Sequence, residues 1–541
     1  MASGSWSRRY VLAPAEWGGF LVSVLAALLL LSRFGISGSL GRDEAVSAYA
    51  GEQLARGVLP YVSIFDPKGP GAGLLAGAAA YLADLFGGND VMAIRITFFL
   101  FACATVVASY LLALRLFGSV LGAVATAAVM ASFHGWALDA FGPDAKVPGI
   151  FFIVLSMVLM SARRWGWAAF AGSLAFLVWQ PLFVFPTLAV VLAGLSATGR
   201  RRFVLLGTAL GGAVAPVLAV LVSYAAAGSL GKLIEAGLVF PLIGRNVGTE
   251  TVPHRAQHIV SVVERYYGQG GVAWTFWLGA LALAVLVAYR VVRRRAGALR
   301  DPLVSVVAVS GLAETLYALI DFQSNADVFP LLPYPALGVG SAVAVAVAWS
   351  RRRGWQLPVP LAAGALIVAL TAGAAVPSQR EQNAGNDGLR PQLEMACGIA
   401  RMLGPSGRLW ALGDPASLVL TDRTNPDRFI YLDSGVAAWK VARLPGGFAS
   451  WTAEIRSVHP AVLVMHDWRS ALKRRMLQWL QHDGGYQLRW LGTWRVFVTP
   501  EARVRARQLN VRLTRHPTYK AFDRVGRSLP PYHCRVLEDY R

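Results

Sequence analysis

The chain has 541 residues, of which 55% are hydrophobic and only 15% are charged. Soluble proteins carry roughly 25% charged residues, so this composition excludes an ordinary soluble domain and predicts a multi-span membrane protein. In such a protein the net charge of +21 is first a topology signal, because the cytoplasmic loops of membrane proteins are rich in lysine and arginine.

Apolar segments of near membrane-spanning length recur along the first two thirds of the chain. The first of them is too long for the apolar part of a signal peptide, so we expect it to be retained as a span. We predict an α-helical multi-span membrane protein with about eleven transmembrane helices, at 17–36, 91–116, 120–133, 148–160, 167–179, 182–195, 203–227, 272–288, 302–320, 330–348 and 357–376.

Six basic clusters fix the expected orientation of these spans. They occur at residues 8–9, 115, 163–164, 200–202, 293–295 and 351–353. With a cytoplasmic N-terminus, eleven spans place every cluster on the cytoplasmic side, as the positive-inside rule requires. Acidic residues gather in the opposite loops, the first of which is 37–90, so we expect a plasma-membrane protein whose chemistry takes place on the extracytoplasmic face.

The composition changes after the last expected span, which divides the chain into a transmembrane part, 1–376, and two further parts. Residues 377–502 alternate β-like runs with helix-like stretches and predict a small extracytoplasmic α/β domain. Residues 503–541 form a basic tail that either contacts anionic lipid headgroups or is simply solvated. Cys397 and Cys534 could form one disulfide in an oxidising compartment. The expected strands are "RLWALG", "RFIYL", "AVLVM" and "WRVFV", and the expected helices are "PQLEMACGIARML" and "SALKRRMLQWLQ".

A short turn in this domain has two interpretations. In "WALGDPASL", Gly413 and Asp414 directly follow an expected strand. A glycine and an acid at that place are found in ligand-binding turns, but a single glycine is a weak signal and a plain loop is the simpler explanation.

The first outer loop carries the densest set of ionisable residues. It reads "RDEAVSAYAGEQLARGVLPYVSIFDPKGPG" from Arg42. Asp43 and Glu44 begin a predicted helix that ends at Gly57, and acids favour a helix N-terminus. Helix capping explains one of the two acids, but it does not explain the segment around Lys68.

This loop resembles the first extracytoplasmic loop of C-type fold membrane glycosyltransferases that use polyprenyl-phosphate sugars, which include protein O-mannosyltransferases and aminoarabinose transferases of lipid A. A second stretch, "DFQSNADVFPLLPYPALGVG", is similar to a later loop of bacterial members and contains Asp321, Gln323 and Asp327. The resemblance implies the C-type glycosyltransferase fold for the membrane part. The matching residues of the first loop are Asp43-Glu44, Tyr49, Gly57, Pro60-Tyr61 and Lys68-Gly69-Pro70.

The resemblance also implies roles for individual residues. Asp43 matches the catalytic base, Glu44 the acid that orients the acceptor or positions Asp43, and Lys68 the cation that holds the donor phosphate, where Arg42 would assist. The chemistry asks for such groups, because a hydroxyl needs a base to become a nucleophile and a leaving phosphate needs a cation. One direct displacement would invert the anomeric configuration.

Further candidates come from the other outer loops. Arg245 and Arg255 are candidates for contacts with the lipid phosphate. Asp139, Asp144 and Asp66 are candidates for a second acid, although Asp144 could instead cap the following helix. Some members place an acid directly before the lysine as a metal ligand, where this chain has Pro67. Whether a divalent cation serves as a cofactor is therefore left open.

We therefore predict an inverting glycosyltransferase that moves a sugar from a polyprenyl-phosphate donor to a hydroxyl acceptor. The expected partners are the lipid-linked donor, membrane lipid, and a cell-envelope glycan, glycolipid or protein as acceptor, with no nucleic acid. The alternative is a transporter or flippase of a lipid-linked substrate, which would be expected to show repeated halves and broken helices at the membrane midplane.

Overall fold

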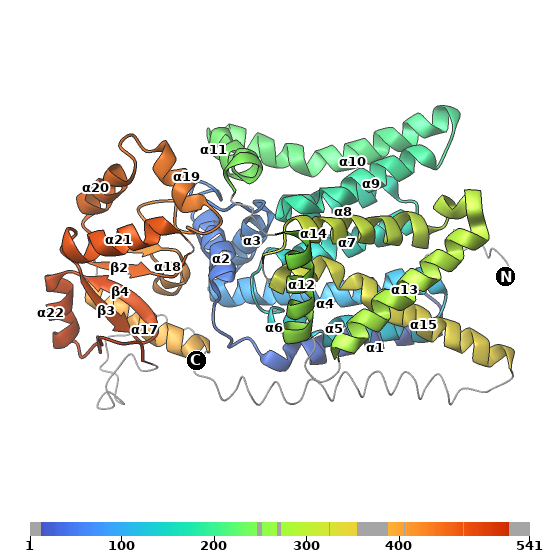
Figure 1. The fold of residues 1–541 in the computed structure, drawn as a ribbon, viewed down its shortest axis with the longest axis horizontal. Coiled ribbons are helices and arrows are strands. Elements are labelled where there is room, and N and C mark those ends of the chain that lie inside the picture. The colour runs from blue at the N-terminus through green and yellow to red at the C-terminus, as the bar shows by residue number, and fades with distance from the viewer. Residues whose placement is uncertain are drawn as a thin grey trace.

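The structure is a computed structural model that describes residues 12–245, 251–267, 272–323, 325–353, 388–404, 406–468 and 470–518. A bundle of long helices occupies one end of the molecule, and a small domain containing the β-sheet lies at the other end (Figure 1). The expected span 357–376 and Cys534 lie outside the described residues.

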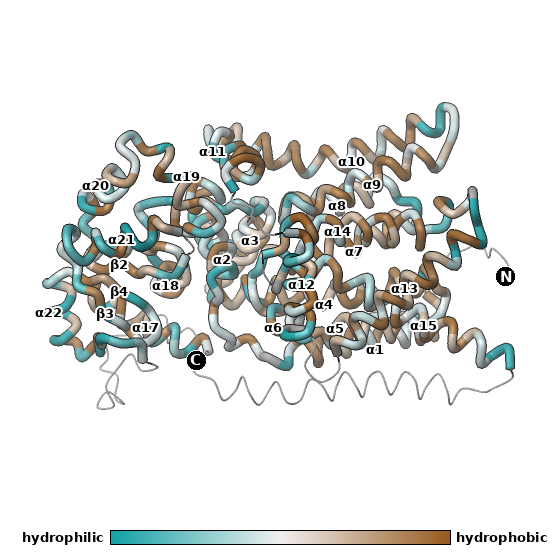
Figure 2. Tube along the Cα trace, viewed as in Figure 1, coloured by the Kyte–Doolittle hydropathy of each residue, from teal (hydrophilic) through white to brown (hydrophobic). Residues whose placement is uncertain are grey.

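The helical bundle confirms the predicted multi-span membrane fold. Among the described residues, six helices are long and apolar enough to cross a membrane, and five shorter apolar helices accompany them. The first ten expected spans each coincide with one of these segments, which are coloured as hydrophobic along most of their length in Figure 2. They are α1(Pro14–Leu31), α4(Asp90–Phe117), α5(Val120–Ser132), α7(Lys146–Ser161), α8(Trp165–Val178), η3(Gln180–Phe183) with α9(Val184–Leu195), α10(Gly199–Ala226), α13(Val272–Arg294), η8(Leu303–Ala308) with α14(Val309–Ile320), and α15(Pro333–Arg352).

Short helices from the loops gather at the end of the bundle that faces the sheet domain (Figure 1). The longest two, α2 and α3, come from the expected first outer loop and pack closely, since a Cβ atom on Gly51 would lie 2.6 Å from the Cβ of Ala76. Small residues permit this close approach of two helices. The elements at this end include α2(Arg42–Ala55), α3(Gly71–Leu85), α6(His134–Leu138), α11(Leu230–Ile234), η4(Glu235–Gly244), α12(Val252–Val262) and η9(Asn325–Leu331).

The basic runs mark the opposite end of the bundle. The α9–α10 connection and the C-terminal ends of α13 and α15 all lie at the end away from the sheet domain (Figure 1). These segments contain the arginine clusters 200–202, 293–295 and 351–353. Three of the six predicted basic clusters thus lie away from the outer-loop helices, and the cluster at 8–9 lies outside the described residues.

The sheet domain contains four strands in the order β1-β2-β4-β3, with β1 parallel to β2 and the other neighbours antiparallel. Three of the expected strands and both expected helices are confirmed. The prediction of a strand at "RFIYL" is wrong, because this segment pairs outside the sheet: the Phe65 N–H donates to the Arg428 carbonyl at 2.7 Å and the Gly413 N–H to the Ile430 carbonyl at 2.6 Å. The elements are α17(Leu389–Leu403), β1(Leu409–Leu412), α18(Ala416–Thr421), α19(Val436–Arg443), α20(Phe448–Val458), β2(Val462–Met465), α21(Ala471–His482), β3(Gln487–Leu491), β4(Trp494–Val498) and α22(Pro500–Gln508).

Buried polar contacts join the sheet domain to the outer-loop helices. The hydroxyl of Tyr49 in α2 accepts a hydrogen bond from the Asn425 N–H at 2.9 Å. Arg428 forms a 2.6 Å ion pair with Glu235 of η4 and donates to the Tyr61 carbonyl at 3.1 Å. Because these groups satisfy one another's hydrogen-bonding capacity, they hold the two regions in one fixed arrangement.

The cysteines differ in state. Cys397, in α17, is disulfide-bonded, whereas Cys103, within the membrane helix α4, is a free and buried thiol.

The start of the predicted basic tail packs on the sheet domain through α22. Ala502 and Ala506 of this helix are buried, and Arg505 donates to the carbonyl of Leu403 at 2.7 Å.

Candidate active site

A cavity of about 920 Å³ lies between the outer-loop helices and the sheet domain. Eight of the twelve side chains proposed from the sequence line it. They are Arg42, Asp43, Lys68, Arg245, Arg255, Asp321, Gln323 and Asp327. Glu44, Asp66, Asp139 and Asp144 are not among the described lining residues.

Asp43 stands in the first turn of α2 with its carboxylate between two cations. Lys68 Nζ lies 3.3 Å from Oδ2, and Arg42 Nε lies 3.6 Å from Oδ1. Within the described part of the chain, Oδ1 accepts no hydrogen bond. The side chain is 32% exposed, so a substrate in the cavity can reach it. Burial acts to raise the pKa of Asp43, but Lys68 and Arg42 outweigh burial and lower this pKa to about 2.

The loop before α3 places Lys68 by backbone contacts. The Tyr61 hydroxyl donates to the Lys68 carbonyl, and Asp66 Oδ1 accepts the Lys68 N–H at 3.0 Å. A Cβ atom on Gly69 would lie 2.0 Å from the Leu177 carbonyl oxygen. Only glycine fits where the loop crosses the end of α8, which explains why Gly69 separates Lys68 from Pro70 in this chain.

The pKa values of Lys68 and Asp66 are both raised, for different reasons. Burial alone would lower the pKa of Lys68, but the nearby carboxylates, Asp43 above all, raise it. Burial raises the pKa of Asp66 to about 6, and Lys68 opposes this shift. Lys68 is therefore a permanent cation at neutral pH, and its first partner is Asp43.

Glu44 is turned away from the cavity. Its Oε2 accepts the Gly41 N–H at 2.9 Å, so it caps α2. A Cβ atom on Gly142 would lie 2.2 Å from Oε1, which shows how closely the loop after α6 covers this carboxylate. Burial raises the pKa of Glu44, with contributions from Asp144 and Asp43 that act in the same direction.

Asp139 and Asp144 belong to the same buried group behind Asp43. Burial raises the pKa of Asp139 well above its usual range, and the neighbouring carboxylates of Glu44 and Asp144 add to the shift. Asp144 Oδ1 accepts the Lys146 N–H at 2.7 Å, which is the helix-capping role considered for it. These acids lie close to Asp43 and are not among the described lining residues of the cavity.

The wall formed by the later loops holds two further ion pairs. Arg245 Nη1 lies 2.8 Å from Asp321 Oδ2, which also accepts the Tyr317 hydroxyl at 2.9 Å. Lys146 Nζ lies 2.6 Å from Asp327 Oδ1, and these two side chains are only 5% and 9% exposed. The second motif found in the sequence thus anchors the cations of this wall.

Gln323 and Arg255 complete the wall. Gln323 donates from its side chain to Asp321 at 2.8 Å and from its backbone to Asp327 at 2.7 Å. Arg255 donates to the carbonyls of Ile320 and Leu319. Both residues therefore tie the lining loops together.

The sheet domain supplies lining residues that the sequence analysis missed. Asp433 binds Arg42 at 2.7 Å, and the Tyr431 ring centroid lies 5.1 Å from the guanidinium carbon of Arg42. The start of α21 brings Lys473 and Arg474 to the cavity. The signal available for α21 was the basic run "LKRR", which does not show that it faces another domain. The missed lining residues of the sheet domain include Tyr431, Asp433, His466, Asp467, Trp468, Lys473 and Arg474.

The described residues contain no group of three or more His, Cys, Asp or Glu side chains placed to hold a metal ion. Asp66 is the acid nearest to Lys68 in the sequence, and its carboxylate accepts the Lys68 backbone N–H. This geometry does not fit a metal site beside Lys68.

A multi-span bundle with a small C-terminal mixed sheet is also the fold of two solved proteins, ArnT and an oligosaccharyltransferase, so the predicted fold is confirmed. The chain is similar to ArnT from Cupriavidus metallidurans in the apo state, with a TM-score of 0.60, 14% sequence identity and coverage of 89% of this chain and 98% of that one. ArnT bound to undecaprenyl phosphate gives a TM-score of 0.59 at 15% identity, with 90% and 98% covered.

A second solved fold agrees with the first. The oligosaccharyltransferase of Archaeoglobus fulgidus in the apo form matches with a TM-score of 0.51 and 12% identity over 85% of this chain and 70% of that chain. No protein-family model and no curated protein matches the sequence. The likeness therefore shows a fold shared with ArnT and with this oligosaccharyltransferase, at low sequence identity.

Proposed function

We propose that this protein is an inverting glycosyltransferase that moves a sugar from a polyprenyl-phosphate donor to a hydroxyl of a cell-envelope glycan, glycolipid or protein. The observation that carries the proposal is the pairing of Asp43 with Lys68 in the wall of the large cavity at 3.3 Å. A base and a phosphate-binding cation lie side by side, in a fold shared with ArnT, which has been solved with undecaprenyl phosphate.

The reaction is one displacement at the anomeric carbon. The acceptor oxygen forms a bond to this carbon while the bond to the phosphate oxygen breaks, and Asp43 takes the hydroxyl proton. The leaving lipid phosphate gains negative charge, which Lys68 stabilises together with Arg245 and Lys146 of the same cavity lining. Attack from the face opposite the phosphate inverts the configuration.

Donor binding would also activate the base. A carboxylate whose pKa is about 2 is ionised at neutral pH but is a weak base, and the most effective base has a pKa near the working pH. A phosphate that draws Lys68 away from Asp43 removes the main charge that lowers the pKa of the carboxylate. The base would then strengthen only when the donor is in place.

We place the active cavity and the sheet domain, residues 377–502, on the extracytoplasmic side of the plasma membrane, with the membrane part at 1–376 and the basic segment at 503–541. Two features support this orientation. The arginine clusters at the ends of α13 and α15 lie away from the sheet domain, and Cys397 is disulfide-bonded, which is typical of an oxidising compartment.

The test is transfer by the purified full-length chain in lipid vesicles, supplied with polyprenyl-phosphate mannose, arabinofuranose or aminoarabinose and with cell-envelope extract as acceptor. We expect one donor to release polyprenyl phosphate and to yield a product of inverted configuration. Movement of an intact lipid-linked sugar between leaflets without cleavage would instead establish the transporter alternative.

The contact between Gly142 and Glu44 yields a more local prediction. In Gly142→Ala, the new Cβ must displace the Glu44 carboxylate, which is the mobile end of a side chain, so the fold should survive. We expect transfer to fall about 10- to 100-fold because small displacements beside a catalytic group are costly. Gly211→Ala in α10, where a Cβ meets nothing within 4 Å, is the control. Equal turnover in both variants, with equal thermal midpoints, would show that Glu44 has no positioning role.

A further inference from the structure

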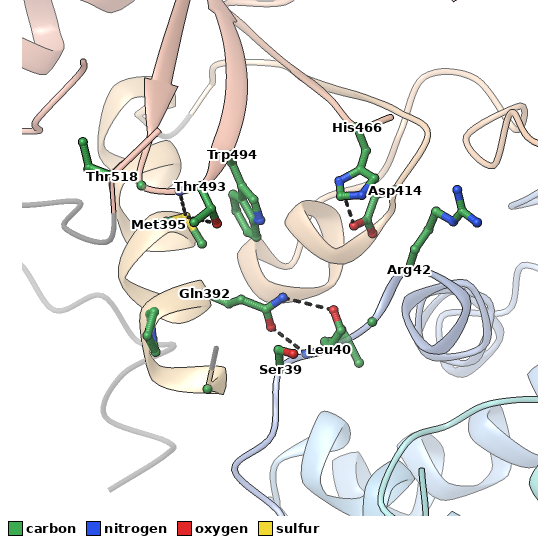
Figure 3. A pocket seen from close by; sticks show the side chains of 14 residues that line it. Ser39, Leu40, Arg42, Gln392, Met395, Asp414, His466, Thr493, Trp494 and Thr518 are labelled. Carbon is green, nitrogen blue, oxygen red and sulfur yellow. Dashed lines mark hydrogen bonds and ion pairs between the residues drawn. The ribbon is translucent and has the colours of Figure 1, made fainter. Parts of the chain in front are cut away.

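A second cleft, of about 430 Å³, lies between the segment that leads into α2 and the sheet domain. Its walls come from α17, the β3–β4 turn and the turns after β1 and β2 (Figure 3). Arg42 and His466 line both this cleft and the large cavity. The cleft therefore adjoins the donor cavity at the residue that directly precedes Asp43.

The lining of the cleft combines one aromatic wall with fixed polar groups. Trp494 stands between Thr493 and the Asp414–His466 pair (Figure 3). His466 Nδ1 lies 3.6 Å from Asp414 Oδ2, while Asp414 Oδ1 accepts the Ala416 N–H at 2.8 Å. The His466 side chain is 48% exposed, so the acid orients a ring whose Nε2 is left for a ligand.

Backbone contacts hold the two sides of the cleft in place. Gln392 in α17 accepts the Leu40 N–H at 2.6 Å and donates to the Leu40 carbonyl at 3.0 Å. Gly492 in the β3–β4 turn has a φ of +60°, and a Cβ there would lie 2.5 Å from Met395 Sδ. The turn is thus fixed against α17, and the cleft is preformed.

The charge of the two spaces differs. The described lining of the large cavity contains seven lysine or arginine and five aspartate residues. The described lining of the cleft contains one arginine, Arg42, and one aspartate, Asp414, besides His466. Lys68, Lys146 and Arg245 line the large cavity and do not appear in the cleft. An anionic lipid phosphate is favoured in the first space, and a neutral polar ligand in the second.

We propose that this cleft is the acceptor subsite and that it takes a neutral saccharide of one or two pyranose units. The apolar face of a pyranose packs on the part of the Trp494 indole that lines the cleft, since this residue is 8% exposed, while its hydroxyls bond to His466, Asp414 and Thr493. A hydroxyl of this saccharide is then presented past Arg42 to Asp43. The proposal rests on the proposed glycosyl transfer and names the chemical class of its acceptor.

The test is saturation-transfer NMR on the full-length chain in nanodiscs, with maltose, cellobiose and mannobiose as neutral probes and glucose 6-phosphate as the anionic probe. We expect at least one neutral disaccharide to bind, and to bind better than the phosphate. Trp494→Ala and Thr493→Glu should each weaken this binding about tenfold or more, which is about 1.4 kcal/mol. Thr493 is exposed, so its variant occupies the cleft without disturbing the core.

Trp490→Ala is the matched control. Trp490 lies on the neighbouring strand β3 and does not appear in the cleft lining, so binding should persist. Absence of neutral-sugar binding to the wild type, preference for the phosphate, or unchanged binding in Thr493→Glu would each overturn the proposal. Binding of undecaprenyl phosphate, measured in parallel, separates two failures: if it persists while the sugars do not bind, only the acceptor subsite is wrong, and if it is absent, the proposed function fails.

Discussion

Asp43→Asn is expected to lower the rate of sugar transfer about 10²- to 10⁴-fold, the usual contribution of a general base. Asparagine keeps the shape of the side chain but cannot take the hydroxyl proton. The loss should appear in kcat, because the acceptor can still bind. Radiolabelled sugar transfer under single-turnover conditions, with saturating donor, measures this step directly.

The donor should bind Asp43→Asn at least as tightly as it binds the wild type. In the wild type Lys68 is shared with the Asp43 carboxylate at 3.3 Å, and the substitution leaves the lysine free for the phosphate. This combination of lost turnover and retained donor affinity separates a base from a residue that only supports the fold. Asp84→Asn on the exposed side of α3 is the control, and transfer by Asp43→Asn within threefold of this control would refute the assignment.

The split between Asp43 and Glu44 shows how far local sequence can go. Both acids begin α2, and the sequence alone leaves open which of them caps the helix. Glu44 at N3 supplies half of a capping box, because its side chain reaches back to the Gly41 N–H while glycine has no side chain to cap in return. An acid at the third helical position is the sequence signal for this contact, and it favours Asp43 as the acid left for the cavity.

Other parts of the site depend on packing between distant segments. Asp433 reaches Arg42 across 391 positions of sequence, and no local pattern encodes such a contact. The same holds for "RFIYL", whose composition favours a strand but whose backbone pairs with Phe65 in the interface. Sequence periodicity identifies spans and helices well because it reports burial, and it fails where the burying surface belongs to another domain.

Gly69 illustrates the opposite case, in which the structure explains a residue of the motif. It stands between Lys68 and Pro70 in the first outer loop. The close approach of Leu177 to this position makes glycine a requirement of the local fold. The loop can then pass the end of α8 and bring Lys68 within 3.3 Å of Asp43.

Lys68→Met is expected to change both donor affinity and the pH dependence of transfer. Removing a charged partner of a phosphate should weaken binding of undecaprenyl phosphate about 10- to 100-fold. Lys68 is also the main group that lowers the pKa of Asp43 to about 2. Without it, burial raises this pKa, so protonation of the base begins at a higher pH as the solution is acidified.

The acid limb of kcat/KM should therefore move to higher pH in Lys68→Met than in the wild type. Lys68→Arg keeps the positive charge and should retain the wild-type limb with a smaller loss of affinity. Lys232→Met, at an exposed position of α11, is the control for removing a lysine. An acid limb that stays in place in Lys68→Met would mean that Asp43 is not the titrating base, and an unchanged donor affinity would mean that Lys68 does not hold the phosphate.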